Sequence, residues 1–362
     1  MVGKSYINII ICLLIIIFNV GGVYASEDKL AEKSYEVFFK NKNKSDFLAL
    51  QSLQKSAQFG YEKAEFDLGV AYGLGEYGLV QDYQKSREWL EKSAEKNNAK
   101  AQLALGIYYL NGDGVQKNTE KSVFWLLKSA NQGNASAQYN LGSMYLSGEG
   151  GNIDYNQAKK WLMASAKQNY SSAQYNLGLM YLKGLGVKKD DAEAFSWILK
   201  AANEGHLVAI YNVGTYYMKG IGVEKNFELA KKWYLKGIER NDNNSAYNLG
   251  VMFFYGLGEN VNYSEAAKWF QKASELGHLD ATYNLGLMYL KGVGVKEDSQ
   301  KAFKLISKAA QQGNSDAQFL FGMMYYRGEG IVKDKKEAIF WLEKSAEQGN
   351  VQAIEILKEL KE

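Results

Sequence analysis

Five asparagines recur along the chain at intervals of 36 residues and are its best candidates for binding chemistry. They are Asn140, Asn176, Asn212, Asn248 and Asn284. A carboxamide donates and accepts hydrogen bonds, but asparagine is a poor helix former, and the surrounding pattern is helical. The series therefore needs an explanation. A binding role and a hydrogen bond that fixes the packing of neighbouring helices both remain open.

Aromatic and basic residues follow the same spacing. Tyrosines precede the asparagines at Tyr139, Tyr175, Tyr211, Tyr247 and Tyr283, and basic residues occupy a second common position at Lys183, Lys219, Lys291 and Arg327. If the basic residues share a groove with the asparagines, they favour an acidic or carboxylate-bearing segment as the ligand. The alternative is a solvated helix end, where positive charge suits the helix dipole.

The same search predicts no catalytic residue, no metal site and no cofactor. His206 and His278 are the only histidines and stand 72 residues apart at one position of the spacing, where a side chain can cap a helix. We find no nucleophile elbow, no phosphate-binding loop and no metal-ligand spacing. The chain is therefore expected not to be an enzyme.

The N-terminus has the features of an export signal. Lys4 precedes an apolar stretch at residues 7–18, and Val23 and Ala25 suit a cleavage site before Ser26. An uncleaved anchor is the alternative, although the stretch is shorter than the roughly 20 apolar residues of a membrane span. The only cysteine, Cys12, lies in this stretch, so the mature chain would lack disulfides. We expect a periplasmic or secreted protein without a stable membrane span after cleavage.

Composition narrows the partner and the fold. The chain has 43 basic and 40 acidic residues, and this balance argues against nucleic acid as a partner. It has 36 glycines and no proline, which suits many helices that end at glycine.

Internal repetition is the strongest signal in the sequence. Glycines recur at Gly69, Gly106, Gly142, Gly178, Gly214, Gly250, Gly286 and Gly322, and we call these the anchor glycines. All seven tryptophans occupy one further position of the same spacing. A glycine inside a helix costs about 1 kcal/mol, so its recurrence predicts a close approach of a second helix.

Each repeat reads as two helices, helix A and helix B. In one repeat, Leu141, Met144 and Tyr145 give helix A an apolar face, and Ala158, Trp161, Leu162 and Ser165 do the same for helix B. An Asp or Asn precedes every helix B and is suited to cap it. Glycine pairs such as Gly148 and Gly150, or Gly184 and Gly186, are expected to turn the chain between the helices.

A hairpin of this size cannot bury its own apolar stripe, so the hairpins must stack on one another. The predicted fold is an all-α solenoid, a superhelix of stacked antiparallel helix hairpins. Its predicted parts are a signal peptide at 1–25, a degenerate capping repeat at 26–60, eight repeats at 61–349 and a capping helix at 350–362.

The repeated motifs resemble a known family. Helix A reads Ala-x-Tyr-x-Leu-Gly-x-Met-Tyr, and helix B reads Ala-x-x-Trp-Leu-x-Lys-Ser/Ala-Ala, with a Gly-x-Gly loop between them. This pattern is similar to the Sel-1-like repeat, a relative of the tetratricopeptide repeat. The resemblance implies adaptor or scaffold roles, often in bacterial envelopes or in host contact. It also implies that the asparagines face a concave groove, where their amides can bond the backbone of an extended peptide.

The predicted function is therefore that of an exported scaffold that binds a protein partner through the concave face. A cell-wall protein that binds or hydrolyses peptidoglycan or a β-lactam is the alternative, because some cysteine-rich relatives have been described in this way. The resemblance is weaker on that point, since the mature chain would have no cysteine.

Overall fold

The computed structural model of the protein describes residues 27–43 and 45–361. The predicted signal peptide at residues 1–25 lies outside this range. The described residues form helices joined by short loops and contain no strand, which confirms the predicted all-α solenoid. No helix among them is long and apolar enough to cross a membrane. The chain divides into two compact units between Asn176 and Leu177.

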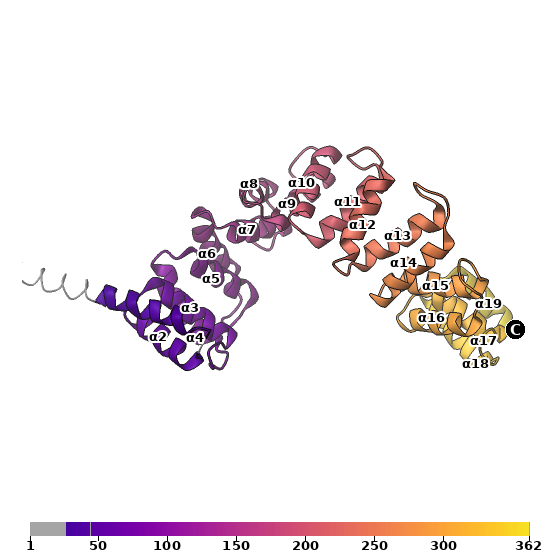
Figure 1. Ribbon diagram of the computed structural model, residues 1–362, viewed down its shortest axis with the longest axis horizontal. Helices are drawn as coiled ribbons and strands as arrows, with labels where there is room; N and C mark the ends of the chain where they lie inside the picture. The colour runs from indigo at the N-terminus through magenta and orange to yellow at the C-terminus, as the bar shows by residue number, and fades with distance from the viewer. Residues whose placement is uncertain (1–26, 44, 362) are drawn as a thin grey trace, which may run out of the picture. The chain divides into compact units, whose positions relative to one another are not determined.

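Each repeat is a pair of antiparallel helices, and the pairs of each unit follow in chain order (Figure 1). The A helices are α3 (Glu62–Leu74), α5 (Ala99–Asn111), α7 (Ala135–Ser147), α9 (Ser171–Lys183), α11 (Leu207–Lys219), α13 (Asn243–Tyr255), α15 (Leu279–Lys291) and α17 (Ser315–Arg327). The B helices are α4 (Tyr83–Glu95), α6 (Thr119–Asn131), α8 (Tyr155–Ala166), α10 (Asp191–Asn203), α12 (Phe227–Ile238), α14 (Tyr263–Glu275), α16 (Ser299–Gln311) and α18 (Lys335–Glu347). At the two ends lie a helix at residues 27–41, α2 (Asp46–Gln58) and α19 (Val351–Lys361).

Short polar side chains begin every B helix, as predicted. The capping residues are Asp82, Asn118, Asp154, Asp190, Asn226, Asn262, Asp298 and Asp334, and each accepts a hydrogen bond from a backbone N–H of the first turn. Such a bond satisfies one of the N–H groups that a helix start leaves without a partner.

The glycine pairs predicted to turn the chain between the helices are confirmed in one repeat and wrong in part in the other. Gly184 and Gly186 have φ angles of 71° and 65°. In the preceding repeat Gly148 has a φ of 80°, but its second positive φ belongs to Gly151 rather than to Gly150. The glycine that reverses this loop therefore lies one position later than expected.

The anchor glycines lie where helix A meets helix B, as predicted. A Cβ atom added to Gly142 would stand 2.6 Å from Cγ of Leu162, and one added to Gly178 would stand 2.4 Å from Cγ1 of Ile198. The same overlap recurs at the other six anchor glycines, always with the residue that follows the tryptophan position. Only a residue without a side chain permits this contact.

Tryptophans fill the space between consecutive hairpins. Trp161 of α8 is 7% exposed and packs with Leu126 of α6 and Leu141 and Met144 of α7. Trp197, Trp233 and Trp341 are similarly buried, whereas Trp89 and Trp125 are half-buried with Lys92 and Lys128 above their rings. The tryptophans therefore belong mainly to the core, as the sequence predicted.

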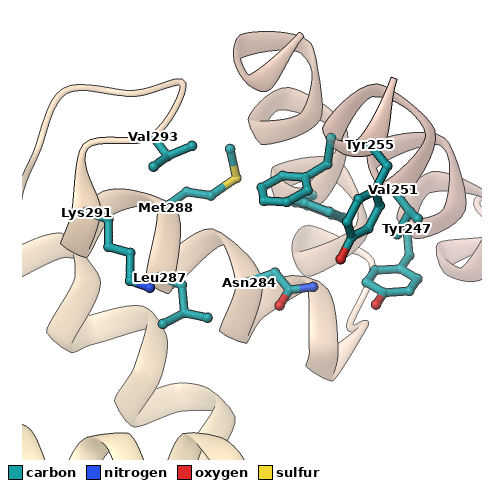
Figure 2. Close-up of a pocket in the computed structure, with 10 residues that line it drawn as sticks. Tyr247, Val251, Tyr255, Asn284, Leu287, Met288, Lys291 and Val293 are labelled. Atoms are coloured by element: carbon teal, nitrogen blue, oxygen red, sulfur yellow. The ribbon is translucent and has the colours of Figure 1, made fainter. Parts of the chain in front are cut away.

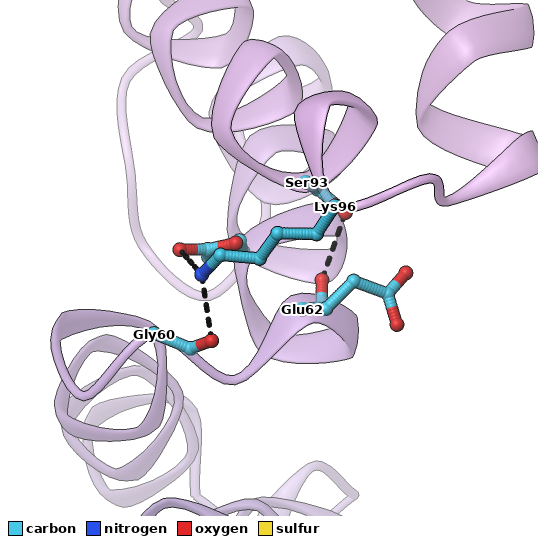
Figure 3. Close-up of polar contacts among 5 residues, drawn as sticks. Gly60, Glu62, Ser93 and Lys96 are labelled. Atoms are coloured by element: carbon cyan, nitrogen blue, oxygen red, sulfur yellow. Dashed lines mark hydrogen bonds and ion pairs between the residues drawn. The ribbon is translucent and has the colours of Figure 1, made fainter. Parts of the chain in front are cut away.

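Polar contacts also tie the two helices of one hairpin together (Figure 3). The Ser93 hydroxyl of α4 donates to the carbonyl of Glu62 at the start of α3, at 2.8 Å. Lys96 donates to the carbonyl of Gly60, and its ammonium lies 2.7 Å from the carboxylate of Glu65, which is 3% exposed. In later repeats the ion pair is replaced by amide pairs, Gln132 with Gln102, Gln168 with Gln138 and Gln348 with Gln318.

Candidate functional site

The five predicted asparagines lie midway along consecutive A helices, and each side chain is half-buried. Asn176 of α9 donates to the hydroxyl of Ser143 on α7 at 3.3 Å, and Asn248 of α13 donates to the hydroxyl of Tyr234 on α12 at 3.3 Å. Asn140 instead donates to the carbonyl of Ser136 within its own helix, at 2.8 Å. At least two of the five amides therefore link separate helices, which is the structural role foreseen for them. Their binding role remains a prediction.

The predicted tyrosines are half-buried rather than fully available. Tyr139 lies against Tyr170 with ring centroids 5.1 Å apart, and Tyr211 lies 6.3 Å from Tyr234. Tyr175 is half-buried too, and its side chain has a non-covalent partner within the protein. These rings therefore contribute to packing.

The predicted basic residues Lys183, Lys219, Lys291 and Arg327 are the last residues of α9, α11, α15 and α17, and all four are exposed. This placement matches the helix-end alternative, because a cation at the C-terminus of a helix interacts favourably with its dipole. Lys291 also lines a cavity.

The cavity lies between the A helices α13 and α15 of the second unit and has a volume of about 280 Å³ (Figure 2). Tyr247, Asn284 and Lys291 line it together. The structure thus brings one tyrosine, one asparagine and one basic residue of the predicted series into a single site.

Helix periodicity explains how the two walls form. Tyr247, Val251, Phe254 and Tyr255 line one wall, and Asn284, Leu287, Met288 and Lys291 line the other. Both sets follow spacings of three, four and seven residues, so each occupies one face of its helix. Phe270 of α14 also lines the cavity. The same side chain packs against the anchor glycine Gly250.

The Tyr247 ring of the cavity is held in place by a neighbour. Burial, first of all, and the charge of Asp280 raise the pKa of Tyr247. The ring of His278 stacks on Tyr247 at a centroid distance of 4.3 Å and an interplanar angle of 13°. Tyr247 therefore stays protonated at neutral pH with a fixed ring.

Both histidines cap A helices, as the sequence predicted. Nδ1 of His206 accepts from the N–H of Ala209, and Nδ1 of His278 accepts from the N–H of Ala281, each at 3.2 Å. Burial lowers the pKa of both rings. The neutral imidazole is the form that can accept this bond.

Sequence reasoning did not identify the apolar lining of the cavity. Phe254, Tyr255 and Phe270 gave no signal as a group, because they join only when α13 and α14 pack together. One signal was present. Tyr255 stands at the helix-end position where four other repeats carry lysine or arginine, so this repeat has an aromatic ring in place of their positive charge.

The repeats match a known protein family. A family model described as the Sel1 repeat matches eight consecutive segments, residues 62–98, 99–134, 135–170, 171–206, 207–242, 243–278, 279–314 and 315–350. The chain belongs to the Sel1 repeat family. Proteins of this family generally act as protein-interaction scaffolds and are typically not enzymes.

Two solved structures of Sel1 repeat proteins resemble most of the chain. A Sel1 repeat protein from Oxalobacter formigenes is 32% identical, with a TM-score of 0.73, over 89% of this chain and 93% of that one. The protective antigen c5321 of uropathogenic Escherichia coli is 29% identical, with a TM-score of 0.70, over 91% of this chain and 79% of that one. Both similarities extend well beyond a single Sel1 repeat.

Proposed function

We propose that this protein is an exported, non-enzymatic scaffold that binds another protein through the face formed by its A helices. The observation that carries the proposal is the cavity between α13 and α15, which Tyr247, Asn284 and Lys291 all line. An apolar hollow with a few fixed polar groups is the usual form of a recognition site. The membership of the Sel1 repeat family supports a protein as the partner.

The charge of this face favours an acidic partner. Lys183, Lys219 and Arg327 are exposed at the ends of three A helices of the second unit. Exposed charges of one sign speed the encounter with a partner of opposite sign and oppose partners of the same sign. Binding is therefore expected to weaken as salt is added.

The test is in-cell crosslinking followed by recovery of the full protein. A variant with Lys183→Gln, Lys219→Gln and Arg327→Gln loses three charges from the A-helix face. Its matched control, Lys188→Gln, Lys232→Gln and Lys304→Gln, loses three exposed charges from loops and B helices of the same unit. All substitutions are at exposed positions, so circular dichroism should show equal helicity in both variants and the parent.

We expect one specific protein to crosslink to the parent and to the control variant, and to be depleted with the A-helix variant. An equal yield from both variants would move the interface away from the A helices. Recovery of peptidoglycan fragments without protein would replace the scaffold by the cell-wall alternative.

Export requires its own measurement. The sequence at Val23, Ala25 and Ser26 supports cleavage after Ala25. N-terminal sequencing of the protein recovered from periplasmic and extracellular fractions should begin at Ser26. A chain that keeps residues 1–25 and stays in the cytosolic fraction would overturn the export proposal without affecting the binding proposal.

A further inference from the structure

Another cavity, in the first unit, is lined by basic side chains. It lies where helix α4 of one repeat meets the loop and the first turn of α6 in the next repeat, and it has a volume of about 290 Å³. Arg87 of α4, Lys117 of the loop and Lys121 of α6 all line it. None of the described residues that line it is an aspartate or a glutamate, so the lining is positively charged.

Two of these cations have acidic partners but keep donors for a ligand. Nη1 of Arg87 donates to Glu91 at 3.4 Å, whereas its Nε is buried and has no hydrogen-bond partner among the described residues. A guanidinium has five N–H donors, so this one bond does not satisfy it. Lys117 pairs with Glu149 at 3.1 Å, but the two side chains are 56% and 45% exposed. Such a surface pair contributes little stability and is easily exchanged for a ligand.

Lys121 has no acidic partner in the part of the chain that the structure describes. Its ammonium lies 5.2 Å from the centroid of the Tyr109 ring, and it takes part in none of the ion pairs. Its backbone N–H donates to the capping side chain of Asn118 at 2.8 Å. Lys121 therefore lies in the first turn of α6, where the helix dipole favours a negative charge. A bound anion would satisfy both the lysine and the helix end.

The equivalent cavity of a later repeat has a mixed lining of lysines and carboxylates. Glu297 stands there at the position of Lys117, beside Asp298, while Lys301 keeps the position of Lys121. No other pair of consecutive repeats has basic residues at all three positions. The accumulation of positive charge is therefore a property of this one cavity and not of the repeat.

We propose that the cavity of Arg87, Lys117 and Lys121 binds a phosphate group, either free or in a monoester. A phosphate monoester carries a charge of about −1.5 to −2 at neutral pH and three strong acceptor oxygens, which match three cations better than a carboxylate does. Arginine presents paired N–H groups to phosphate oxygens, and lysine adds a point charge. A single phosphate would fill only part of about 290 Å³, which leaves room for the group that an ester carries. This ligand is independent of the proposed scaffold function.

Isothermal titration calorimetry with the full mature chain tests the proposal. The ligands are inorganic phosphate and glycerol 3-phosphate, with glycerol as the uncharged control, at low ionic strength because salt screens the attraction. We expect both phosphates to bind at a single site and glycerol not to bind. Tighter binding of glycerol 3-phosphate would identify a soluble monoester as the ligand, and equal affinities would identify free phosphate.

Variants assign the binding to the cavity. Arg87→Gln and Lys121→Gln should each weaken phosphate binding by about 10-fold, the usual size of a hydrogen bond to a charged group. The control Lys301→Gln, at the position equivalent to Lys121, should leave the affinity unchanged. Glu149→Gln releases Lys117 and should tighten binding by about 3-fold. A variant that only loosens the fold would not bind more tightly, so this gain separates binding from stability.

A lipid headgroup is the other source of a phosphate monoester. Sedimentation with mixed vesicles of phosphatidic acid and phosphatidylcholine distinguishes it, because the parent would then be retained by the vesicles and Lys121→Gln would not. No binding at about 10 mM of either phosphate, or equal affinities of the parent, Arg87→Gln and Lys121→Gln, would overturn the proposal.

Discussion

Gly142 of α7 and Leu162 of α8 are in such close contact that a Cβ atom on Gly142 would stand 2.6 Å from Cγ of Leu162 and 3.0 Å from its backbone nitrogen. The hairpin can close only because this position has no side chain. The same relationship holds at every anchor glycine, so the periodic glycine is a packing residue.

Gly142→Ala is therefore expected to destabilise its hairpin. Overpacking of a tight contact costs about 1 to 3 kcal/mol, which exceeds the roughly 1 kcal/mol that alanine gains over glycine in a helix. Urea unfolding of the mature chain, followed by circular dichroism, measures the change in the free energy of unfolding.

Gly150→Ala is the matched control for this substitution. Gly150 lies in the same repeat, and a Cβ atom there would meet nothing closer than 3.6 Å. The free energy of unfolding should change by less than about 0.5 kcal/mol. Equal effects of the two substitutions would show that the close contact is not the cause.

The ion pair between Lys96 and the buried carboxylate of Glu65 should behave differently when broken and when replaced. Lys96→Ala leaves the carboxylate of Glu65, 3% exposed, without its cation. Loss of one partner of a buried pair costs about 3 to 5 kcal/mol, and we expect the lower end because Lys96 is 43% exposed. Hydrogen exchange of α3 and α4 would report the local loss of stability.

The double variant Glu65→Gln with Lys96→Gln should restore most of this loss. It recreates the amide pair that Gln102 and Gln132 form at 2.7 Å in the next repeat. We expect the free energy of local opening that hydrogen exchange reports for α3 and α4 to lie within about 1 kcal/mol of the parent value. If the double variant is as unstable as Lys96→Ala, the two pairs are not equivalent.

The asparagine series should separate into structural and non-structural members. Asn248→Ala removes a bond between α13 and Tyr234 of α12 and should lower the free energy of unfolding by about 0.5 to 1 kcal/mol. Asn140→Ala removes only a bond within α7 and should raise it by about 0.5 kcal/mol, since alanine is the better helix former. Stabilisation by both substitutions would argue that the series is kept for binding.

Stability should fall on mild acidification because of the two histidines. Burial lowers the pKa of His206 and His278, so the unfolded chain takes up these protons at a higher pH than the folded chain does. The two neutral histidines contribute fully to the free energy of unfolding above the histidine pKa of the unfolded chain, about 6.5. This contribution is lost as the pH falls through the lowered pKa of the folded state.

The variant His206→Asn with His278→Asn isolates this effect, because Asn314 caps the equivalent helix without titrating and the chain has no further histidine. The melting temperature of the parent should drop more between pH 7.5 and 5.5 than that of the variant. Parallel curves would mean that carboxylates alone set the dependence.

The sequence by itself determined the hairpins, their number and their ends. Each of these features is local or strictly periodic. Asp154 caps the helix that follows it, and Gly142 recurs because every copy of the unit needs the same close contact. A pattern repeated eight times also removes the ambiguity that one short amphipathic segment would have.

Only the tertiary structure decided which polar residues bond to one another and where a cavity opens. Asn140 and Asn248 occupy the same position of the repeat, yet one bonds within its own helix and the other bonds to Tyr234 on the helix before it. Phe254, Phe270 and Met288 lie on three helices and meet around one cavity. Periodicity describes what the repeats share, whereas this cavity depends on the side chains by which neighbouring repeats differ, and their fit is settled only when the hairpins pack.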